Sequence, residues 1–377
     1  MVKKEYNDVL REEFLGGEKL KKILENQQYV IVGKNSGVKI CEWTKKSLRG
    51  EGVCWKEKFY GIKSHRCAEM SPAVMWCENY CLHCWRAIEN NLGMKLNEYD
   101  EPEKIIEGII EGRKKLLSGF GGYKDVDRQK LKEAVEPTLF TLSLSGEATI
   151  YPKLAELIKL IRKRGAVSFL VTNGLNPEKL KELEKKNALP TQLAISLNAG
   201  NKKLYDKWHR SLKKNAWEKL NESLELMKKL KGKTRRVIRM TLVKGDSKNK
   251  ESQSDQVVGD SLSLKLKRPQ SGAKEFSLSS PNNISNMTDD DVKDYAGLIK
   301  KAQPDFIHVK GFMSVGFSRK RFTYEQMPLH PEIQAFAKKL AKELKNEDYV
   351  IKADEERSRV VLIAKKGVRL KIDMKKV

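Results

Sequence analysis

From about residue 70 to residue 345, short apolar segments of strand character alternate with longer segments of helical period. This alternation constrains the fold most strongly, because repeated β/α units produce a parallel sheet with helical crossovers. Six units suit an open barrel better than a closed barrel of eight. We therefore expect an α/β protein with a partial (βα)6 TIM-like barrel. Its expected strands are AVMW (73–76), TLFTLSLSGE (138–147), VSFLVTNG (167–174), TQLAISLNA (191–199), RRVIRMTLVKG (235–245) and DFIHVKG (305–311).

The segments outside these units suggest the domain organisation. Residues 1–69 form an N-terminal extension before the barrel of residues 70–345, and residues 346–377 alternate like a small antiparallel C-terminal β appendage. Residues 245–286 contain ten serines and no sustained apolar period. Such a segment cannot bury enough apolar surface to offset its ordering entropy, so we expect a disordered insertion after the fifth strand.

The charge balance favours a polyanionic partner. Lys and Arg exceed Asp and Glu by 75 to 50, a formal net charge of +25 spread along the chain. A basic surface of this kind suits nucleic acid, although solvated Lys-rich helix faces alone would need no partner. No stretch approaches the roughly 18 apolar residues of a membrane span, and the N-terminus lacks a signal-peptide pattern. We therefore expect a cytoplasmic protein with no membrane association.

The six cysteines all lie between residues 41 and 84, which indicates metal binding rather than a disulfide framework. Cys77, Cys81 and Cys84 have the spacing C-x3-C-x2-C, with no cysteine downstream to complete a tetrahedral site. Zinc sites usually have four ligands, whereas an iron–sulfur cube held by three thiolates keeps one iron open.

A second triplet lies upstream at Cys41, Cys54 and Cys67, where successive thiols are thirteen residues apart. This spacing is too wide for a finger-type loop, and a fourth thiolate is again missing. One alternative is a non-enzymatic RNA-binding protein with two zinc sites, the upstream one completed by His65. Metal analysis of anaerobically purified protein would separate zinc from two iron–sulfur cubes.

The C-x3-C-x2-C loop, directly before a βα series, resembles the signature of the radical S-adenosylmethionine superfamily. The resemblance implies a [4Fe–4S] cluster on Cys77, Cys81 and Cys84 whose open iron binds S-adenosyl-L-methionine (SAM). One electron then cleaves SAM to a 5′-deoxyadenosyl radical. His83 stands where the superfamily commonly has an aromatic residue before the last cysteine.

The same resemblance implies contacts to SAM at the ends of the second, third and fourth strands. In SGE at 145–147, Gly146 permits close backbone approach and Glu147 accepts from the ammonium group of the cofactor. Asn173 in TNG and Ser196 in SLNA are further candidates, although each could equally serve a turn or a helix cap.

Both cysteine triplets, with SPAVMWCENYCLHCWR, SLSGEATIYP, RMTLVKG and VKGFMSVGFSRKR, make the chain similar to the tRNA 4-demethylwyosine synthase family, in its form without a flavodoxin domain. The resemblance spans nearly all of residues 25–365 except the insertion. It implies a lyase of wybutosine biosynthesis that joins N1-methylguanosine-37 of tRNA(Phe) to pyruvate. It also implies a second [4Fe–4S] cluster on Cys41, Cys54 and Cys67. Asn198 stands where the family commonly has Asp.

The resemblance places a catalytic lysine at Lys56, two residues after Cys54, where an extended chain would bring both side chains to one face. In a partly desolvated pocket beside other cations, a lysine amine can lose its proton and form a Schiff base with pyruvate. Alternatively, pyruvate chelates the open iron of the second cluster and Lys56 steadies its charge.

The partners implied are tRNA, pyruvate and an unidentified electron donor, and we expect a monomer. Trp85 and Arg86, after the radical cysteines, and residues 319–321, after the sixth strand, are candidate contacts to RNA. A different radical enzyme, such as a tRNA methylthio-transferring enzyme or a glycyl-radical activase, is the second alternative. It would need neither pyruvate nor the upstream triplet.

Overall fold

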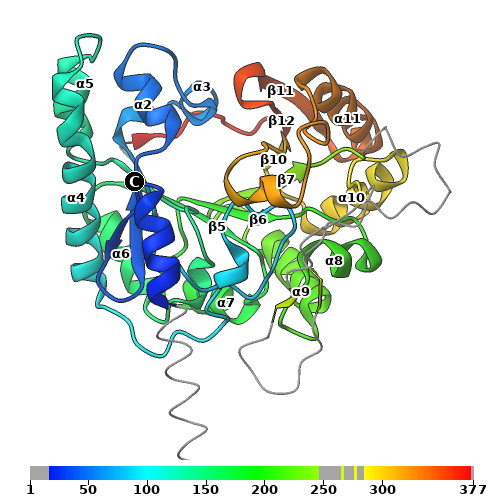
Figure 1. The fold of residues 1–377 in the computed structure, drawn as a ribbon. Helices are drawn as coiled ribbons and strands as arrows, with labels where there is room; N and C mark the ends of the chain where they lie inside the picture. Colours follow the sequence, from blue (N-terminus) through cyan, green and yellow to red (C-terminus); the bar gives the residue numbers. More distant parts are fainter. Residues whose placement is uncertain (1–16, 246–264, 267–275, 278–283, 375–377) are drawn as a thin grey trace, which may run out of the picture.

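The strands in the middle of the chain are buried on both faces, which explains their nearly continuous apolar runs. In the computed structural model, which describes residues 17–245, 265–266, 276–277 and 284–374, these strands belong to a ten-stranded sheet. Figure 1 shows that the sheet curves into an open barrel. Its strands are β1 (Val30–Val32), β2 (Ser36–Lys39), β3 (Cys67–Ser71), β4 (Leu139–Leu142), β5 (Val167–Thr172), β6 (Gln192–Ser196), β7 (Arg235–Leu242), β10 (Phe306–Gly311), β11 (Tyr349–Glu355) and β12 (Val360–Lys365).

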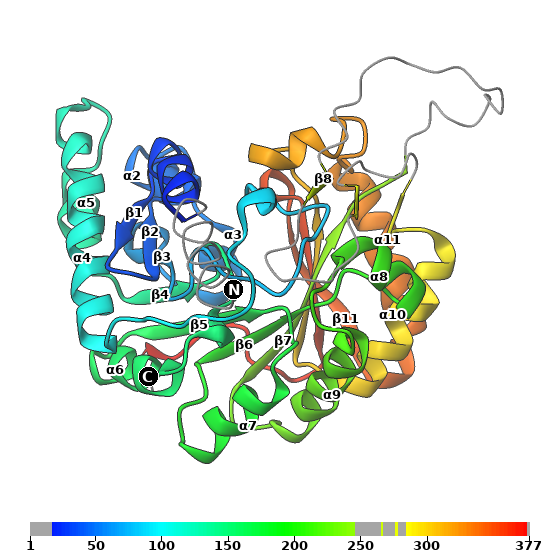
Figure 2. The ribbon, with the colours of Figure 1, turned by 60° about the horizontal axis from the view of Figure 1, so that its bottom comes forward.

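Six of these strands run parallel in the order β3-β4-β5-β6-β7-β10, which confirms the predicted partial (βα)6 barrel. Six helices, α4, α6, α7, α9, α10 and α11, pack against one another in that order and cover the convex face (Figure 2). Among the described residues, no helix combines the length and apolar character needed to cross a membrane. The helices are α2 (Glu42–Leu48), α3 (Trp55–Tyr60), α4 (Pro102–Ser118), α5 (Arg128–Ala134), α6 (Leu154–Lys163), α7 (Pro177–Lys185), α8 (Lys202–His209), α9 (Ala216–Lys229), α10 (Asp289–Ala302) and α11 (His330–Glu343).

The first barrel strand lies earlier than predicted. Residues 73–76 form a turn and coil rather than a strand, and β3 ends at Ser71. Pro72 has no N–H to donate to a sheet, so it stops the strand there. Val74 and Met75 are instead buried against the helical residues 17–26. The boundary expected at residue 69 consequently falls inside β3, and Cys67 is the first residue of the first parallel strand of the barrel.

The C-terminal hairpin forms as predicted, from β11 and β12 with a turn at residues 356–358, but it is continuous with the barrel. β12 pairs antiparallel with β10, from Phe306 opposite Ala364 to Lys310 opposite Val360. Five consecutive residues of β12 are buried, so this strand needs cover on both faces and cannot stand as an outlying appendage. β1 and β2 extend the other edge of the sheet in the same antiparallel way.

Helix α3 fills part of the concave face of the sheet. Trp55, Phe59 and Tyr60 of α3 are buried against inward-facing apolar residues of the strands, among them Phe169 and Phe306. The Tyr60 hydroxyl group is also hydrogen-bonded to Nε2 of His308. The N-terminal extension therefore contributes to the interior of the barrel and covers the apolar part of its concave face.

Much of the insertion expected at 245–286 lies outside the described residues, namely 246–264, 267–275 and 278–283. Within it, β8 (Lys265–Leu266) and β9 (Phe276–Ser277) form a short antiparallel pair. Its expected end at residue 286 is wrong, because Ile284 and Asn286 are buried. Asn286 accepts a hydrogen bond from Val243 N at 2.7 Å and donates to the carbonyls of Asn198 and Thr241, both at 2.9 Å.

Replacing Asn286 with Ala should cost about 2–4 kcal/mol of unfolding free energy, because one buried N–H and two carbonyl groups lose their partner. Urea unfolding followed by circular dichroism measures the change. The matched control is Asn97→Ala at an exposed position, expected to stay within about 0.5 kcal/mol of the parent. Equal effects of the two substitutions would contradict the packing described for Asn286.

Candidate active site

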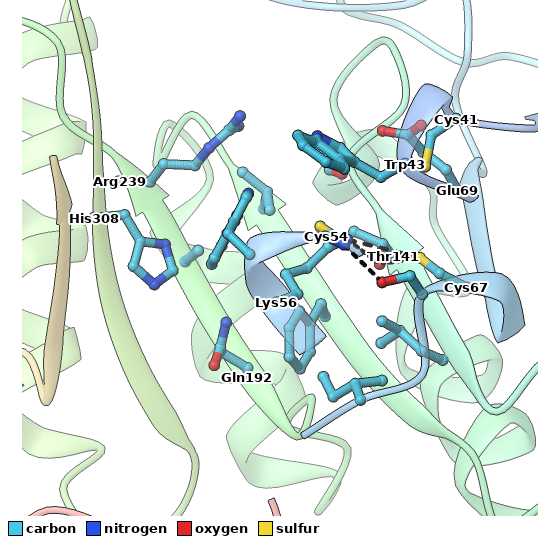
Figure 3. Close-up of a pocket in the computed structure, with 18 of the residues that line it drawn as sticks. Cys41, Trp43, Cys54, Lys56, Cys67, Glu69, Thr141, Gln192, Arg239 and His308 are labelled. Atoms are coloured by element: carbon cyan, nitrogen blue, oxygen red, sulfur yellow. Dashed lines mark hydrogen bonds between the residues drawn. The ribbon is translucent and has the colours of Figure 1, made fainter. Parts of the chain in front are cut away.

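The upstream cysteines come together around a cavity of about 180 Å³ on the concave face of the barrel (Figure 3). Cys41 and Cys54 are the N-cap residues of α2 and α3, and Cys67 is the first residue of β3. Cys41 Sγ accepts the capping hydrogen bond of α2 from Thr44 N at 3.4 Å, whereas Cys54 makes no side-chain capping bond, and both residues line the cavity. Burial raises the pKa of Cys41 to about 12 and that of Cys54 to about 11.

Lys56 projects into the same cavity, although not for the reason expected. The chain is helical rather than extended at this point, since α3 begins at Trp55. Lys56 Nζ lies 3.7 Å from Cys67 Sγ and donates to Thr141 Oγ1 at 3.2 Å. Burial lowers the pKa of Lys56, but the thiols of Cys67, Cys54 and Cys41 outweigh it and hold the pKa above its ordinary value.

The downstream triplet lines a second cavity of about 280 Å³. Cys77, Cys81 and Cys84 all lie in the loop after β3, and the other predicted residues lie at or just after the ends of β4, β5 and β6. Gly146, Glu147, Asn173 and Ser196 line this cavity as well, so the structure brings together every site residue predicted for the radical cluster and its cofactor.

Backbone and side-chain hydrogen bonds hold the cysteine loop from several sides. Tyr80 N donates to His209 O at 2.9 Å and Leu82 N donates to Trp208 O at 3.0 Å. Arg321 donates to the carbonyls of Leu82, Cys84 and Arg86 and forms an ion pair with Glu89 at 2.7 Å. Arg321 is 4% exposed, so its predicted contact to RNA phosphate is wrong, and it positions the loop instead.

Arg86 is also buried and donates to Val74 O at 3.2 Å, so it faces the interior of the protein rather than solvent. Trp85 stacks on Tyr29, with ring centroids 6.1 Å apart. By contrast, Arg319 and Lys320 are exposed. Of the predicted RNA contacts, these two are exposed, and Trp85 is partly exposed at the wall of the second cavity.

Gly146 allows the loop after β4 to approach the cysteine loop. Its φ is +71°, and a Cβ atom at this position would lie 1.8 Å from Ala73 O. The next residue, Glu147, donates its N–H to Trp76 O at 2.8 Å. Only glycine combines this backbone conformation with so close an approach.

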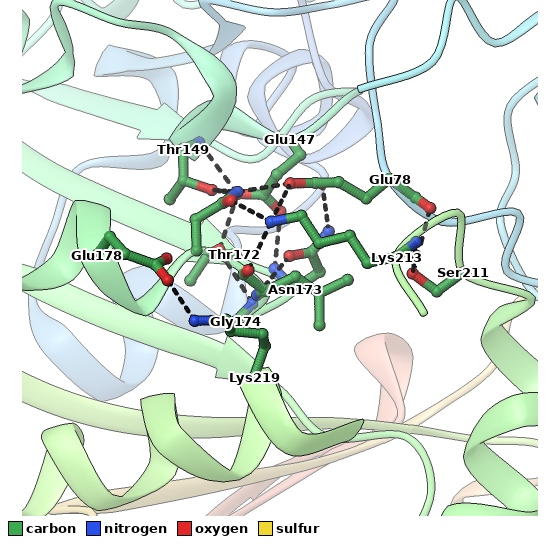
Figure 4. A network of polar contacts seen from close by, with 12 residues as sticks. Glu78, Glu147, Thr149, Thr172, Asn173, Gly174, Glu178, Ser211, Lys213 and Lys219 are labelled. Carbon is green, nitrogen blue, oxygen red and sulfur yellow. Dashed lines mark hydrogen bonds and ion pairs between the residues drawn. The ribbon is translucent and has the colours of Figure 1, made fainter. Parts of the chain in front are cut away.

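The Glu147 carboxylate is the centre of a buried polar network (Figure 4). It accepts hydrogen bonds from Thr149 N at 3.1 Å, from the Thr149 and Thr172 hydroxyl groups at 2.7 Å, and from Asn173 N at 2.7 Å. Burial and the nearby Glu78 carboxylate together raise the pKa of Glu147 to about 7, despite these donors. A cation bound beside Glu147 would lower this pKa, so the site favours a ligand with an ammonium group.

Residues 83 and 198 depart from the pattern that the resemblance predicts, and both lie at the second cavity. The His83 ring stacks on Trp208 with centroids 5.7 Å apart, and burial holds its pKa well below the ordinary value. His83 is therefore a neutral, flat ring at this place. The Asn198 side chain accepts from Thr241 N at 2.8 Å, which is a structural contact that fixes β6 to β7.

The zinc alternative required His65 to complete the upstream triplet. His65 Nε2 instead pairs with Glu133 at 2.9 Å, and His65 does not line the upstream cavity. In the described part of the chain, no group of three or more His, Cys, Asp or Glu side chains is arranged to hold a single metal ion.

Several residues of the site escaped the sequence analysis. Glu78 lies between the first two radical cysteines and accepts from Asn173 Nδ2 at 2.9 Å and Asn176 Nδ2 at 2.5 Å. Arg239 and Lys310 line both cavities and join them. A charged residue inside an otherwise apolar strand is the signal that could have revealed the last two.

Comparison with known proteins supports this description of the site. A model of the radical SAM superfamily matches residues 72–252, and a model described as wyosine base formation matches residues 301–365. An S-adenosyl-L-methionine-dependent tRNA 4-demethylwyosine synthase from Pyrococcus abyssi is 40% identical over 352 residues, which are 93% of this chain and 90% of that relative. Its counterpart from Methanocaldococcus jannaschii is 34% identical and covers 92% of this chain and 96% of its own.

Among solved structures, that of TYW1 with a lysine–pyruvate adduct bound is similar to this chain with a TM-score of 0.72 and 32% sequence identity. The match covers 95% of this chain and 98% of that one. The partial barrel, the cysteine loop and the match to the superfamily model together define a radical SAM enzyme. Enzymes of this class use a [4Fe–4S] cluster and SAM. Within this class, the chain belongs to the family of S-adenosyl-L-methionine-dependent tRNA 4-demethylwyosine synthases, the enzymes of wyosine base formation.

The donor set of the second cavity fits such a cluster. Burial raises the pKa of Cys77 to about 12 and that of Cys81 well above its ordinary value. Buried thiols of this kind become stable thiolates when a metal replaces their protons. Cys81 Sγ also lies 3.0 Å from Nδ1 of His209, a contact that can orient the sulfur.

Replacing Gly146 with Ala should cost at least about 2 kcal/mol more unfolding free energy than Gly165→Ala. Both glycines have positive φ, +71° and +65°, so an alanine at either position loses about 1–2 kcal/mol of unfolding free energy to the left-handed conformation. Only at Gly146 would the new methyl group also overlap a backbone oxygen, because nothing lies within 4 Å of a Cβ at Gly165. Urea unfolding of both variants measures the difference, and equal costs would contradict the close approach.

Proposed function

We propose that this enzyme joins N1-methylguanosine-37 of tRNA(Phe) to pyruvate and forms the tricyclic base 4-demethylwyosine. The observation that carries the proposal is that two cysteine triplets line two connected cavities of one barrel, with Lys56 in the upstream one. The related TYW1 structure with a lysine–pyruvate adduct supports the use of pyruvate at a lysine. The relatives are named as tRNA-modifying enzymes, which supports tRNA as the substrate.

In the second cavity, we assign Cys77, Cys81 and Cys84 to the radical cluster and Glu147 to the ammonium group of SAM. Bound there, the cluster and SAM supply the radical that removes a hydrogen atom from the substrate methyl group. Gly146, Asn173 and Ser196 line the same cavity and are proposed as contacts to the rest of the cofactor. The buried Glu78 carboxylate holds the Asn173 side chain in place.

In the upstream cavity, we assign Cys41, Cys54 and Cys67 to a second [4Fe–4S] cluster. Three thiols line one cavity, with Cys54 and Cys67 buried and Cys41 partly exposed, and they fit this role for the same reason as in the radical loop. Lys56 is proposed as the amine that attacks the keto carbon of pyruvate. Thr141 and Cys67 orient its nitrogen. The Lys56 ammonium group must lose a proton before the amine can attack.

The RNA is expected to approach the open side of the second cavity. Met313 and Val315 are 39% and 42% exposed and line this cavity after β10, where they can contact an unstacked base. Arg319 and Lys320 are exposed in the same segment and suit phosphate contacts. The electron donor, the monomeric state and the cytoplasmic location stay predictions from the sequence.

Incubation with reductant, SAM, pyruvate and tRNA that contains N1-methylguanosine should produce the tricyclic base, detected by mass analysis of the nucleosides. Ala variants of Cys77, Cys81 or Cys84 should form neither 5′-deoxyadenosine nor this base. Ala variants of Cys41, Cys54 or Cys67 should still form 5′-deoxyadenosine but not the base. Loss of both products in the upstream variants would indicate a folding role for these cysteines. Failure of the parent enzyme to form the tricyclic base in this tRNA would refute the proposed reaction.

Borohydride added together with pyruvate should trap a covalent adduct on Lys56, located by peptide mass analysis. Lys56→Arg keeps the positive charge but cannot form a Schiff base, so both the adduct and the tricyclic base should fall to background. Lys58→Arg is the matched control, because Lys58 lies in the same helix and pairs with Glu355 at 3.0 Å, away from the cavity. An adduct on another lysine, or an active Lys56→Arg enzyme, would rule out this role.

A further inference from the structure

Two cations meet at the junction of the two cavities. Arg239 on β7 and Lys310 on β10 line both cavities, together with Ser143 and Val171. In the parallel ladder, Arg239 lies opposite His308, and Lys310 lies opposite Thr241. Side chains two residues apart on a strand point to the same face, so both cations project from adjacent strands into the barrel interior.

Neither cation has an anionic partner in the described part of the protein. No hydrogen bond or ion pair joins either side chain to another described residue, and the Lys310 ammonium group lies 5.9 Å from the centre of the Trp55 ring. Burial lowers the pKa of Arg239, and burial together with Arg239 lowers that of Lys310 to about 8. Holding two like charges in such a place is costly unless an anion completes the site.

Three other arginines of this protein are buried and satisfied, whereas Arg239 is partly exposed at the cavity wall. Arg113 donates to the carbonyls of Ala134, Cys67 and His65. Arg236 forms an ion pair with Asp305 at 2.6 Å, and Arg321 pairs with Glu89 at 2.7 Å. The lack of a partner at Arg239 is therefore specific to the cavity and not a general feature of the interior.

We propose that Arg239 and Lys310 bind the carboxylate group of the α-keto acid whose keto carbon faces Lys56. This inference rests on the proposed function and adds the subsite that selects an acid over a neutral carbonyl compound. Lys56 and the two cations line the same cavity, so one small ligand can contact all three side chains. The planar guanidinium group of Arg239 can hold a carboxylate through two parallel hydrogen bonds.

The cysteine side of the cavity carries one carboxylate, that of Glu69, but no hydrogen bond or ion pair joins it to Arg239. Figure 3 shows Arg239 and His308 across the cavity from Cys41, Cys54 and Cys67. After burial, the main charge that acts on Arg239 is that of Glu69, whose side chain lies beside Cys41 in the same view. A small anion between the two sides would face both Lys56 and the cation pair.

The covalent step leaves the carboxylate intact. The neutral amine of Lys56 attacks the keto carbon, a C=N bond forms, and the keto oxygen leaves as water. Arg239 and Lys310 make no bond in this step and act as binding and positioning residues. They hold the acid so that its keto carbon, and not another atom, meets the lysine nitrogen.

The test uses oxamate, an isostere of pyruvate that keeps the carboxylate but does not form a Schiff base readily. Calorimetry on anaerobically purified full-length protein should show oxamate binding that weakens about tenfold or more in Arg239→Gln and in Lys310→Met. Lys63→Met is the matched control, because Lys63 lines the same cavity but pairs with Glu133 at 2.8 Å. Lys63→Met should bind oxamate within about threefold of the parent protein.

Equal oxamate affinity in the parent and both cation variants, or no binding by the parent, would overturn the proposal. Arg239→Lys and Lys310→Arg should keep part of the affinity, which tests the charge if the first variants fold poorly. Thermal unfolding without ligand should be unchanged or higher in Arg239→Gln and Lys310→Met, because an uncompensated charge is removed. A lower unfolding temperature, with oxamate affinity equal to that of the parent, would show a purely structural role.

Borohydride trapping separates this subsite from the proposed function. With pyruvate, half-maximal trapping on Lys56 should need about tenfold more acid in the cation variants, whereas trapping with methyl pyruvate, which lacks the carboxylate charge, should be unchanged. Failure of the parent to form any adduct on Lys56 would refute the Schiff base but leave the oxamate result to decide the anion site. Equal trapping of pyruvate in parent and variants would refute the subsite alone.

Discussion

The packing of α3 on the concave face of the sheet is the interaction on which the site depends. An open barrel exposes the inward side of its strands, and here Trp55, Phe59 and Tyr60 cover the apolar part of that side. The same short helix carries Cys54 at its start and Lys56 in its first turn. One buried contact thus stabilises the barrel and also sets the upstream cysteines beside the strand ends, so the two cavities come to share a wall.

The site contains two pairs of like charges. Glu78 and Glu147 lie together near the cysteine loop after β3, where burial and their mutual repulsion raise the pKa of Glu147 to about 7. Arg239 and Lys310 lie where the two cavities join. Each group is unfavourable by itself, and each is relieved by a ligand of the opposite charge. The arrangement therefore suits one ligand with an ammonium group and another with a carboxylate.

Local patterns predicted the barrel and most of the site because their signals are confined to short segments. Five of the six expected barrel strands formed, as β4, β5, β6, β7 and β10. Errors occurred where a tertiary contact decided the outcome. AVMW is apolar because Val74 and Met75 pack against the helical residues 17–26, not because they form a strand. Arg321 belongs to a basic run in sequence, yet its side chain turns inward to the carbonyls of the cysteine loop.

The sequence by itself determined the six-unit barrel, the two cysteine triplets and the glycine and glutamate after the second strand, since periodicity and short spacings are properties of the chain alone. Only the tertiary structure decided that the upstream thiols surround Lys56, that His65 turns to Glu133, and that Arg239 and Lys310 meet without a partner. These residues are far apart along the chain and belong to different strands and helices. Their proximity depends on how the sheet curves and on what fills its concave face, which no local pattern records.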